Sequence, residues 1–596
     1  MVNRRQELLA DVHASTDDHA RLVFADFLED EGDHDRALLI RRQCELAALP
    51  AWDRRATEAR WEVERLLAEH GDAWRAALPE LAGVTWLEFE RGFITTAQVE
   101  TPAALYEHAE AIRIANPAIT TIAIAKFAEV EAPAPPGNLS WLRRIRLDGS
   151  SDLEARPQET LLDQVEELEL RDIEGWAAQY LFVPHRDVVP LRRLVVRDEH
   201  ALGGPIATWL ATTPRAKHLR ELRIGTSWID HDTGYYSDPT LRFAGATALA
   251  SCGLAELELL EVGRQRVSSP GLAAILSTAP EVRELDASAC ELTTFDALAL
   301  PGAALVRLDL SLNAIRDDGM PAILASPRVT ALESLRLDTC ELGAGAIVAL
   351  IESPCWQTLR VLDLSRNPLG VAGAAALAAS ARPAQLHTLK VANCDLDDGA
   401  AHLLGAIEWL DQLVVVDLAA NTVATELVAA LAGVRALDLA GTVLVGERER
   451  RFAGIWQRAV ELDLAGLSLG GILADAAPAL QRLSLAGCSV AVPQIEQLLS
   501  PSFPVLQRLN LAGCDLQHDE LIALLAQQPR TSVRELDLRR MAWTPDQLLQ
   551  LARAKPPWIS LKLNGEPWNY PDELGEELER LLGDNWQWHP DDPRDY

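Results

Sequence analysis

The sequence predicts an α/β repeat fold: a solenoid of short parallel strands with helices on its convex side, preceded by a small α-helical cap. Two observations predict it. A hydrophobic segment of the form LxxLxL recurs through most of the chain, whereas residues 1–82 do not repeat and place their apolar residues at helical spacing. The length of 596 residues also exceeds what one compact core usually supports, which favours an elongated array.

The N-terminal cap is expected over residues 1–82. Apolar residues follow the helical period in RRQELLADVHAS, DDHARLVFADFLEDEGD, HDRALLIRRQCELAAL and DRRATEARWEVERLLAEHGDAW, which are separated by Asp, Gly and Pro. Residues 83–160 are expected to hold transitional strands, with weak repeat matches at VTWLEF (84–89), ITTIAI (119–124) and LRRIRL (142–147). The cap would then close the open end of the sheet.

The repeats are expected over residues 161–565. The second leucine of the motif falls at Leu168, Leu194, Leu222, Leu257, Leu285, Leu308, Leu335, Leu362, Leu389, Val416, Leu437, Leu462, Leu483, Leu509, Leu536 and Leu561. From Leu335 to Val416 every interval is 27 residues. Each unit supplies a strand, a turn and a helical or irregular return, and stacking buries the apolar faces that a single unit leaves exposed.

One turn position after the strand carries small or amide side chains. It reads Cys290, Asn313, Cys340, Asn367, Cys394 and Asn421, and later Cys488 and Cys514. An inward side chain at a tight turn must be compact, as Cys is, or must hydrogen-bond the neighbouring backbone, as Asn does. We therefore expect a structural ladder of buried free thiols, rather than disulfides, a redox site or metal ligands.

This pattern resembles leucine-rich repeats of the longer type found in ribonuclease inhibitor, over about two-thirds of the chain. In the cap, ARLVFADFLEDEGD, RRQCEL, LLAEHGDAW and LEFERGFI are similar, over roughly residues 8–100, to the bacterial repeat-companion domain. That module precedes repeats and has no established activity. The resemblances imply a bacterial leucine-rich-repeat protein and no catalytic residue.

No catalytic or cofactor motif survives inspection of the repeat register. GLSLG (466–470) matches a nucleophile elbow, but alignment of LDLAGLSL with LNLAGCDL places Ser468 at the position of Asp515 in an ordinary turn. The sequence lacks a phosphate-binding glycine loop and an HExxH pair. We therefore expect no enzyme activity, no cofactor and no metal.

An insertion near SWIDHDTGYYSDP (227–239) lengthens one unit. Its acidic residues and His231 lack the glycine turn of a calcium loop. Trp228, Tyr235 and Tyr236 make it a candidate contact element for a protein partner, with a plain surface insertion as the alternative. Residues 566–596 leave the leucine register and predict one amphipathic helix near Trp568, Trp586 and Trp588, either a hydrophobic lid on the last repeat or a partner-docking tail.

The formal charge of −33 and the pI of about 4.8 argue against nucleic-acid or anionic-membrane binding. We see neither a signal peptide nor an apolar run long enough for a membrane span, so we expect a cytoplasmic protein.

The residue between the motif leucines should face the concave side of the sheet, because strand side chains alternate. There Asp309, Arg336, Asp363, Lys390 and Asp417 alternate in sign and are expected to pair with one another. Farther along, Asp417, Asp438 and Asp463 follow one another with Glu461 beside them, and neither Val415 nor Ala436 supplies a base. We call Asp417, Asp438 and Asp463 the acid row.

The expected function is a non-catalytic scaffold or adaptor that binds another protein, with a basic segment at the acid row. One alternative is a regulator, inhibitor or cleavage substrate of a protease in a bacterial stress or defence pathway. Another is an enzyme such as a leucine-rich-repeat ubiquitin ligase. Such ligases need a large catalytic domain, whereas about 30 residues follow the last repeat identified here.

Overall fold

The computed structural model describes residues 2–15, 17–125, 139, 141–148, 159–162, 164–171, 189–197, 203–225, 241–445, 452–468, 473–527, 531–564, 577–578, 580–582 and 586–589. The chain falls into two compact units, Met1–Cys340 and Glu341–Tyr596. Each unit is described by itself.

Unit 1 begins with four helices: α1 (Val2–Ala14), α2 (His19–Asp30), α3 (His34–Ala48) and α4 (Arg54–Ala76). Asp33 and Asp53 cap α3 and α4, because their side chains accept hydrogen bonds from the first-turn N–H groups of Arg36 and Arg55. Phe24, Leu28 and Ile40 pack with Phe93 in a core that joins the helices to the following strands. The helical cap expected from the sequence is therefore present.

The first strands after the cap are antiparallel, which corrects the expectation of a weak repeat at 84–89. β1 (Val84–Trp86) pairs with β4 (Thr96–Val99), and the short strands β2 (Phe89–Glu90) and β3 (Phe93–Ile94) form a hairpin. Arg91 and Gly92 turn the chain with φ of 50° and 83°. A Cβ at Gly92 would lie 2.1 Å from Cγ1 of Ile40 in α3, so this turn requires glycine.

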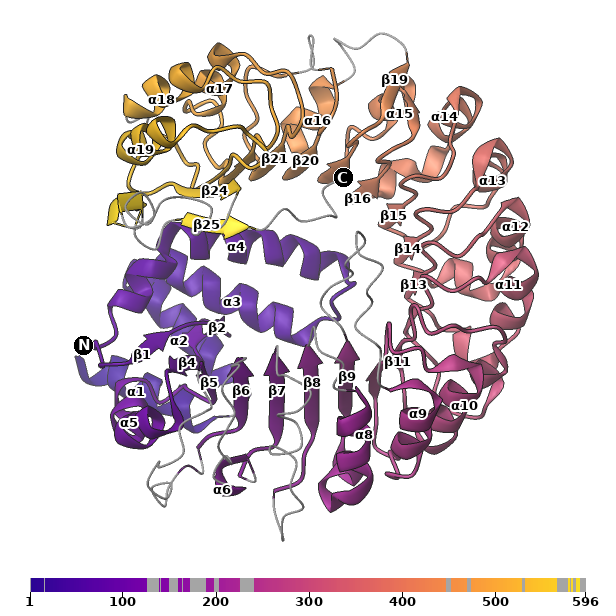
Figure 1. The fold of residues 1–596 in the computed structure, drawn as a ribbon, viewed down its shortest axis with the longest axis horizontal. Coiled ribbons are helices and arrows are strands. Elements are labelled where there is room, and N and C mark those ends of the chain that lie inside the picture. Colours follow the sequence, from indigo (N-terminus) through magenta and orange to yellow (C-terminus); the bar gives the residue numbers. More distant parts are fainter. Residues whose placement is uncertain are drawn as a thin grey trace. The chain divides into compact units, whose positions relative to one another are not determined.

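The parallel sheet of unit 1 starts at β4 (Figure 1). Its next strands are β5 (Thr121–Ile124), β6 (Arg144–Asp148), β7 (Glu167–Arg171), β8 (Arg193–Arg197), β9 (Glu221–Gly225), β10 (Leu259–Glu261), β11 (Glu284–Asp286), β12 (Arg307–Asp309) and β13 (Ser334–Arg336). The returns contain α5 (Pro102–Ala115), α6 (Glu159–Leu162), α8 (Gly203–Thr212), α9 (Arg242–Ala250), α10 (Ser268–Thr278) and α11 (Arg316–Leu324).

The register of unit 1 agrees with the predicted leucine ladder at every strand but one. Leu168, Leu194 and Leu222 lie opposite one another, and so do Leu285, Leu308 and Leu335. In β10, however, Leu260 and not Leu257 pairs with Leu222 and Leu285. The segment LAELELLEV contains two overlapping matches to the motif. One has Leu257 as its second leucine, and the other begins at Leu257 and has Leu260 as its second leucine. The structure uses the later match, which continues to Val262.

Unit 2 continues the same architecture with β14 (Val361–Asp363), β15 (Thr388–Lys390), β16 (Val415–Asp417), β18 (Ala436–Asp438), β20 (Glu461–Asp463), β21 (Arg482–Ser484), β22 (Arg508–Asn510), β23 (Glu535–Asp537), β24 (Ser560–Asn564) and β25 (Trp586–His589). Its helices are α12 (Ala344–Glu352), α13 (Gly370–Ala378), α14 (Asp398–Gly405), α15 (Thr425–Ala430), α16 (Ala453–Arg458), α17 (Val492–Leu498), α18 (His518–Ala526) and α19 (Pro545–Ala554).

In each unit the helices of the returns lie along the convex side of the parallel strands (Figure 1). A second, two-stranded parallel pair, β17 (Thr422–Ala424) with β19 (Val443–Val445), lies in the returns of unit 2. The α/β solenoid predicted from the sequence, with its helical cap, is confirmed.

The C-terminal residues correct a second expectation. β25 pairs in parallel with β24, with Trp586 opposite Leu561, so the sheet gains a strand where the leucine register had been thought to end. Aromatic residues favour strands as aliphatic ones do, and a search for leucines misses a strand that carries tryptophan in their place. Trp568 lies outside the described residues.

Candidate partner-binding surface

The asparagines of the turn ladder bind the backbone of two neighbouring turns. The Nδ2 of Asn421 donates to the carbonyls of Val391, Leu418 and Ala419 at 2.8–3.1 Å, and its Oδ1 accepts from the N–H groups of Cys394 and Leu396. Asn313 does the same two pairs of repeats earlier, within unit 1. Asn367, one pair earlier, accepts from the N–H of Leu342 and donates to the carbonyls of Leu364 and Ser365.

The cysteines of the ladder also form hydrogen bonds, a role that the sequence analysis had assigned to Asn alone. Their Sγ atoms lie 3.0–3.4 Å from main-chain carbonyl oxygens of the preceding turn: Cys290 on Val262, Cys340 on Leu310, Cys394 on Leu364, Cys488 on Leu464 and Cys514 on Leu485. All eight cysteines of the chain are buried and free. Burial raises the pKa of the Cys290, Cys340 and Cys514 thiols to about 12, so these groups stay protonated donors.

The aspartates between the motif leucines cap their own turns, which the sequence analysis did not anticipate. The carboxylates of Asp417, Asp438 and Asp463 accept from the N–H groups two residues ahead, at 2.9–3.1 Å. Asn510 makes the same bond to the N–H of Ala512. Asp or Asn recurs immediately after the second leucine of the motif, and this recurrence could have predicted the turn bonds. Short side chains with a carbonyl-type oxygen favour such turns.

The acid row is half-buried and uncompensated. Asp417, Asp438 and Asp463 lie directly opposite one another on β16, β18 and β20. Burial, and then the neighbouring carboxylate, raise the pKa of Asp417 and of Asp438 to about 6. Burial also raises the pKa of Asp463. In the part of unit 2 that the structure describes, no cation forms an ion pair with any of the three.

Glu461 differs from the acid row. It lies opposite Arg482 on β21 and forms an ion pair with it. The sequence-based interpretation considered only Val415 and Ala436, on the strands that precede β20 in the sheet. The base is Arg482, on the strand that follows. Glu461 therefore brings no unpaired charge to the surface.

A hollow of about 470 Å³ extends over β15–β24 and contains the acid row. Most of its other charged groups are paired: Glu461 contacts Arg482, Glu535 contacts Lys562 at 2.8 Å, and Asp537 contacts Arg539 at 2.8 Å. Arg508 adds a further cation, 3.9 Å from the same Glu535. Lys390 lies beside Asp417 in register and, without reaching ion-pair distance, partly offsets the rise in the pKa of that carboxyl. The hollow is thus acidic over β16–β20, whereas cations outnumber carboxylates over β21–β24.

The alternating ladder expected from Asp309 to Asp417 forms only in part. Arg336 reaches Asp309 at 3.8 Å. Lys390 lies opposite Asp363 and Asp417, yet neither carboxylate comes within ion-pair distance among the described residues. The carboxylate of Asp363 accepts from the N–H of Ser365 in its own turn.

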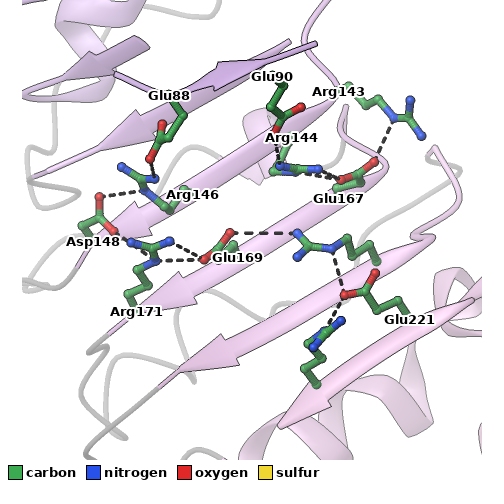
Figure 2. Close-up of polar contacts among 12 residues, drawn as sticks. Glu88, Glu90, Arg143, Arg144, Arg146, Asp148, Glu167, Glu169, Arg171 and Glu221 are labelled. Atoms are coloured by element: carbon green, nitrogen blue, oxygen red, sulfur yellow. Dashed lines mark hydrogen bonds and ion pairs between the residues drawn. The ribbon is translucent and has the colours of Figure 1, made fainter. Parts of the chain in front are cut away.

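The strand face of unit 1 contrasts with this hollow because its carboxylates are paired with arginines (Figure 2). Arg146 contacts Glu88 at 2.6 Å and Asp148 at 3.0 Å, and Arg144 contacts Glu167 at 2.6 Å. The chain of ion pairs continues through Glu169, Arg171, Arg193, Glu221 and Arg223. This face therefore offers a cationic partner no row of unpaired carboxylates.

The remaining candidates from the sequence carry no site. Trp228, Tyr235 and Tyr236 of the insertion lie outside the described residues. Ser468 is exposed in the turn after β20. Within the described ranges there is no group of three or more His, Cys, Asp or Glu suited to a metal ion. None of the described helices is long and apolar enough to cross a membrane.

Comparison with known proteins supports the repeat assignment. A family model described as "Leucine Rich repeat" matches residues 305–324 and 357–378. Among curated proteins there is no match. The match covers two short segments and, together with the stacked parallel register, supports a leucine-rich-repeat solenoid as the fold.

Two solved structures are similar at low identity. The leucine-rich-repeat ectodomain of the plant membrane receptor kinase GASSHO1/SCHENGEN3 from Arabidopsis thaliana, in complex with CASPARIAN STRIP INTEGRITY FACTOR 2, matches with 17% identity and a TM-score of 0.34. The match covers 78% of this chain, which spans 55% of that ectodomain. A chain of the Rad7 and Elc1 complex in yeast matches with 17% identity and a TM-score of 0.30, over 47% of this chain and 76% of that one.

Proposed function

We propose that this protein is a non-catalytic interaction scaffold that binds a partner protein through a cationic segment laid on the acid row. The single observation that carries the proposal is the group of three adjacent half-buried carboxylates without a paired cation. A partner that supplies positive charge there relieves their mutual repulsion, whereas the surface over β21–β24, where cations outnumber carboxylates, gains nothing from added positive charge.

The dimensions of the hollow suit an extended segment. Neighbouring strands lie about 4.8 Å apart, so three successive carboxylates span roughly 10 Å. Alternate side chains of an extended peptide, about 7 Å apart, can meet such a row. Two residues after each aspartate, beyond the end of the strand, stand the small residues Ala419, Ala440 and Ala465, which leave the approach to the acid row open.

The test compares two triple variants that change net charge equally. One carries Asp417→Asn, Asp438→Asn and Asp463→Asn. The control carries Glu352→Gln, Glu408→Gln and Glu496→Gln, three exposed positions of unit 2 that do not line the hollow. A partner captured from the native host and identified by mass spectrometry should associate more slowly with the first variant, and with a flatter salt dependence, than with the control. Equal rates for both variants across salt concentrations would refute the proposal.

Other features support the finer assignment of the chain. The alternation of Asn and Cys supports repeats of the ribonuclease-inhibitor type, and free thiols support a reducing, cytoplasmic location. The resemblance of the cap to repeat-companion domains supports a bacterial source. No described residue favours the role in protease control over the scaffold role.

A further inference from the structure

A second hollow, of about 400 Å³, lies in unit 1 between the helical cap and the first parallel strands. Three segments bring four arginines to its wall: Arg21 comes from α2, Arg91 from the β2–β3 turn, and Arg143 and Arg144 from the entry into β6. In a chain with a formal charge of −33, four arginines around one hollow form a local exception. The acid row of unit 2 takes no part in this site.

The arginines outnumber the carboxylates that line the hollow, which are Glu90 and Glu167. Asp18 is shared by Arg91 at 2.8 Å and Arg21 at 3.6 Å. Glu167 is likewise shared by Arg144 at 2.6 Å and Arg143 at 2.9 Å, Glu90 reaches Arg144 at 3.5 Å (Figure 2), and Glu166 reaches Arg143 at 3.8 Å. Each guanidinium group has five N–H donors, more than these contacts use.

One polar atom at the wall, Oγ1 of Thr95, is removed from solvent without a hydrogen-bond partner. Buried polar groups are nearly always satisfied in folded proteins, so an unsatisfied hydroxyl beside a hollow points to a missing partner. Nε of Arg91 lies 2.8 Å from Asp18 and leaves the other N–H groups of this guanidinium for a ligand. The remaining wall is apolar, formed by Val12, Phe93, Pro117 and Ala118.

We propose that this hollow binds a small phosphate ester, with its phosphate on the arginines and its organic part on the apolar wall. Guanidinium groups match the paired oxygens of a phosphate, and a phosphate monoester carries roughly two negative charges that the surplus of arginine can balance. The volume lies within the range of about 300–1,000 Å³ usual for small-molecule sites. A bare phosphate ion would contact only the arginines, and an uncharged apolar ligand would contact only the apolar wall.

His13 provides a built-in reporter, because it lines the same hollow. Its pKa is lowered by burial and then by the positive charge of Arg21. A bound dianion opposes the second effect, so occupancy should raise the pKa of His13. The test therefore titrates His13 by NMR in the full-length protein, with and without phenyl phosphate, and measures binding of phenyl phosphate, inorganic phosphate and phenol by calorimetry.

The expected result is binding of phenyl phosphate, weaker binding of inorganic phosphate, no binding of phenol, and a rise in the pKa of His13 with the ester. Arg91→Gln and Arg143→Gln should each weaken the ester about tenfold, the usual effect of losing one charge-assisted hydrogen bond. Arg113→Gln, an exposed position on α5 outside the hollow, removes the same charge and should change nothing.

Several outcomes would overturn the proposal. An unchanged His13 titration at saturating ester would place binding elsewhere. If Arg113→Gln weakens binding of the ester as much as the other variants do, the effect is general charge attraction. If inorganic phosphate binds as tightly as phenyl phosphate, the organic part of the ester contributes nothing to binding. If Arg91→Gln fails to fold, Arg143→Gln still decides, because the Arg143 side chain is 60% exposed and contributes little packing.

Discussion

The Sγ of Cys394 lies 3.2 Å from the carbonyl oxygen of Leu364, and the N–H of the same cysteine donates to Oδ1 of Asn421 at 2.9 Å. One residue thus links the turn before it with the turn after it. Repetition of this link explains why the ladder alternates: the amide of Asn needs backbone groups on both sides, and Cys fits between two such amides while still donating its thiol proton.

The ladder cysteines should resist thiol reagents in the native protein. Their thiols are buried, and burial raises the pKa of Cys290, Cys340 and Cys514 to about 12, so thiolate is scarce at neutral pH. Mass spectrometry after labelling should find Cys290, Cys340, Cys394, Cys488 and Cys514 unmodified until denaturant is added. Rapid labelling of all five in native buffer would contradict their burial.

Asn421 should contribute more to stability than the residue that replaces it in the next repeat. Asn421→Ala leaves buried carbonyls and N–H groups without partners, and we expect a loss of about 2–4 kcal/mol in the free energy of unfolding. Thr442 holds the equivalent position one repeat later, and its hydroxyl is buried without a partner. Thr442→Val should therefore be neutral or slightly stabilising. Denaturant titration of both variants measures the difference, and similar losses would contradict this account.

The sequence predicted the sheet well because its signal is repeated. Leu362, Leu389 and Val416 each confirm the position of the next, and the structure pairs them as expected. Errors arose where a repeat stood without such support. Leu257 and Leu260 both fit the motif, Trp586 carries no leucine signal, and the strand at 84–86 turns back because Gly92 permits a hairpin.

The candidate surface was predicted only in part, because charge pairing depends on side-chain direction as well as on register. Asp417, Asp438 and Asp463 do stand in one row. Glu461, however, pairs with Arg482, and the carboxylate of Asp363 accepts from the N–H of Ser365 in its own turn. The repeat register of the sequence gives the position of a carboxylate on its strand, but it does not show which neighbouring group the carboxylate contacts.

The acid row should make stability fall as the pH rises from about 4 to about 6. The folded-state pKa values of Asp417 and Asp438 are raised to about 6 from 3.8, so folding favours the protonated form. Their contribution is complete below pH 4 and is lost as the pH passes 6. Asp417→Asn, Asp438→Asn and Asp463→Asn together should therefore raise the free energy of unfolding at pH 7, relative to the parent, by on the order of 1 kcal/mol and leave it unchanged at pH 4.

Replacement of the same residues by Ala distinguishes charge from capping. Asn keeps the oxygen that accepts from the turn, as Asn510 does, whereas Ala removes it. The triple Ala variant should be less stable than the triple Asn variant at every pH, by about 0.5–1.5 kcal/mol for each lost bond. Equal stability of the two triple variants would show that these turn bonds contribute nothing.

The last prediction concerns Arg146, which joins the hairpin after the cap to the sheet of unit 1. Its guanidinium contacts Glu88 and Asp148, and its side chain is only 8% exposed (Figure 2). Burial alone would raise the pKa of Glu88, but the hydrogen bond and charge of Arg146 outweigh it, and the pKa is lowered. Arg146→Met should thus remove the cation that pairs with Glu88, leave Asp148 only Arg171 at 3.9 Å, and cost about 2–3 kcal/mol, below the usual cost of a fully buried pair because Glu88 is half-exposed.

The control is Arg220→Met, since Arg220 and Glu258 form an exposed pair 3.8 Å apart that should contribute less than about 0.5 kcal/mol. Hydrogen exchange should show faster opening of residues 84–99 in Arg146→Met and not in Arg220→Met, because only the first loses an anchor of the hairpin. The parental loss of stability in acid should also shrink in Arg146→Met, because the lowered pKa of Glu88 stabilises the fold above about pH 4.5 and this contribution is lost as the pH falls. Equal protection of the hairpin in both variants would mean that apolar contacts alone, such as that of Phe93 with Phe24, hold the hairpin in place.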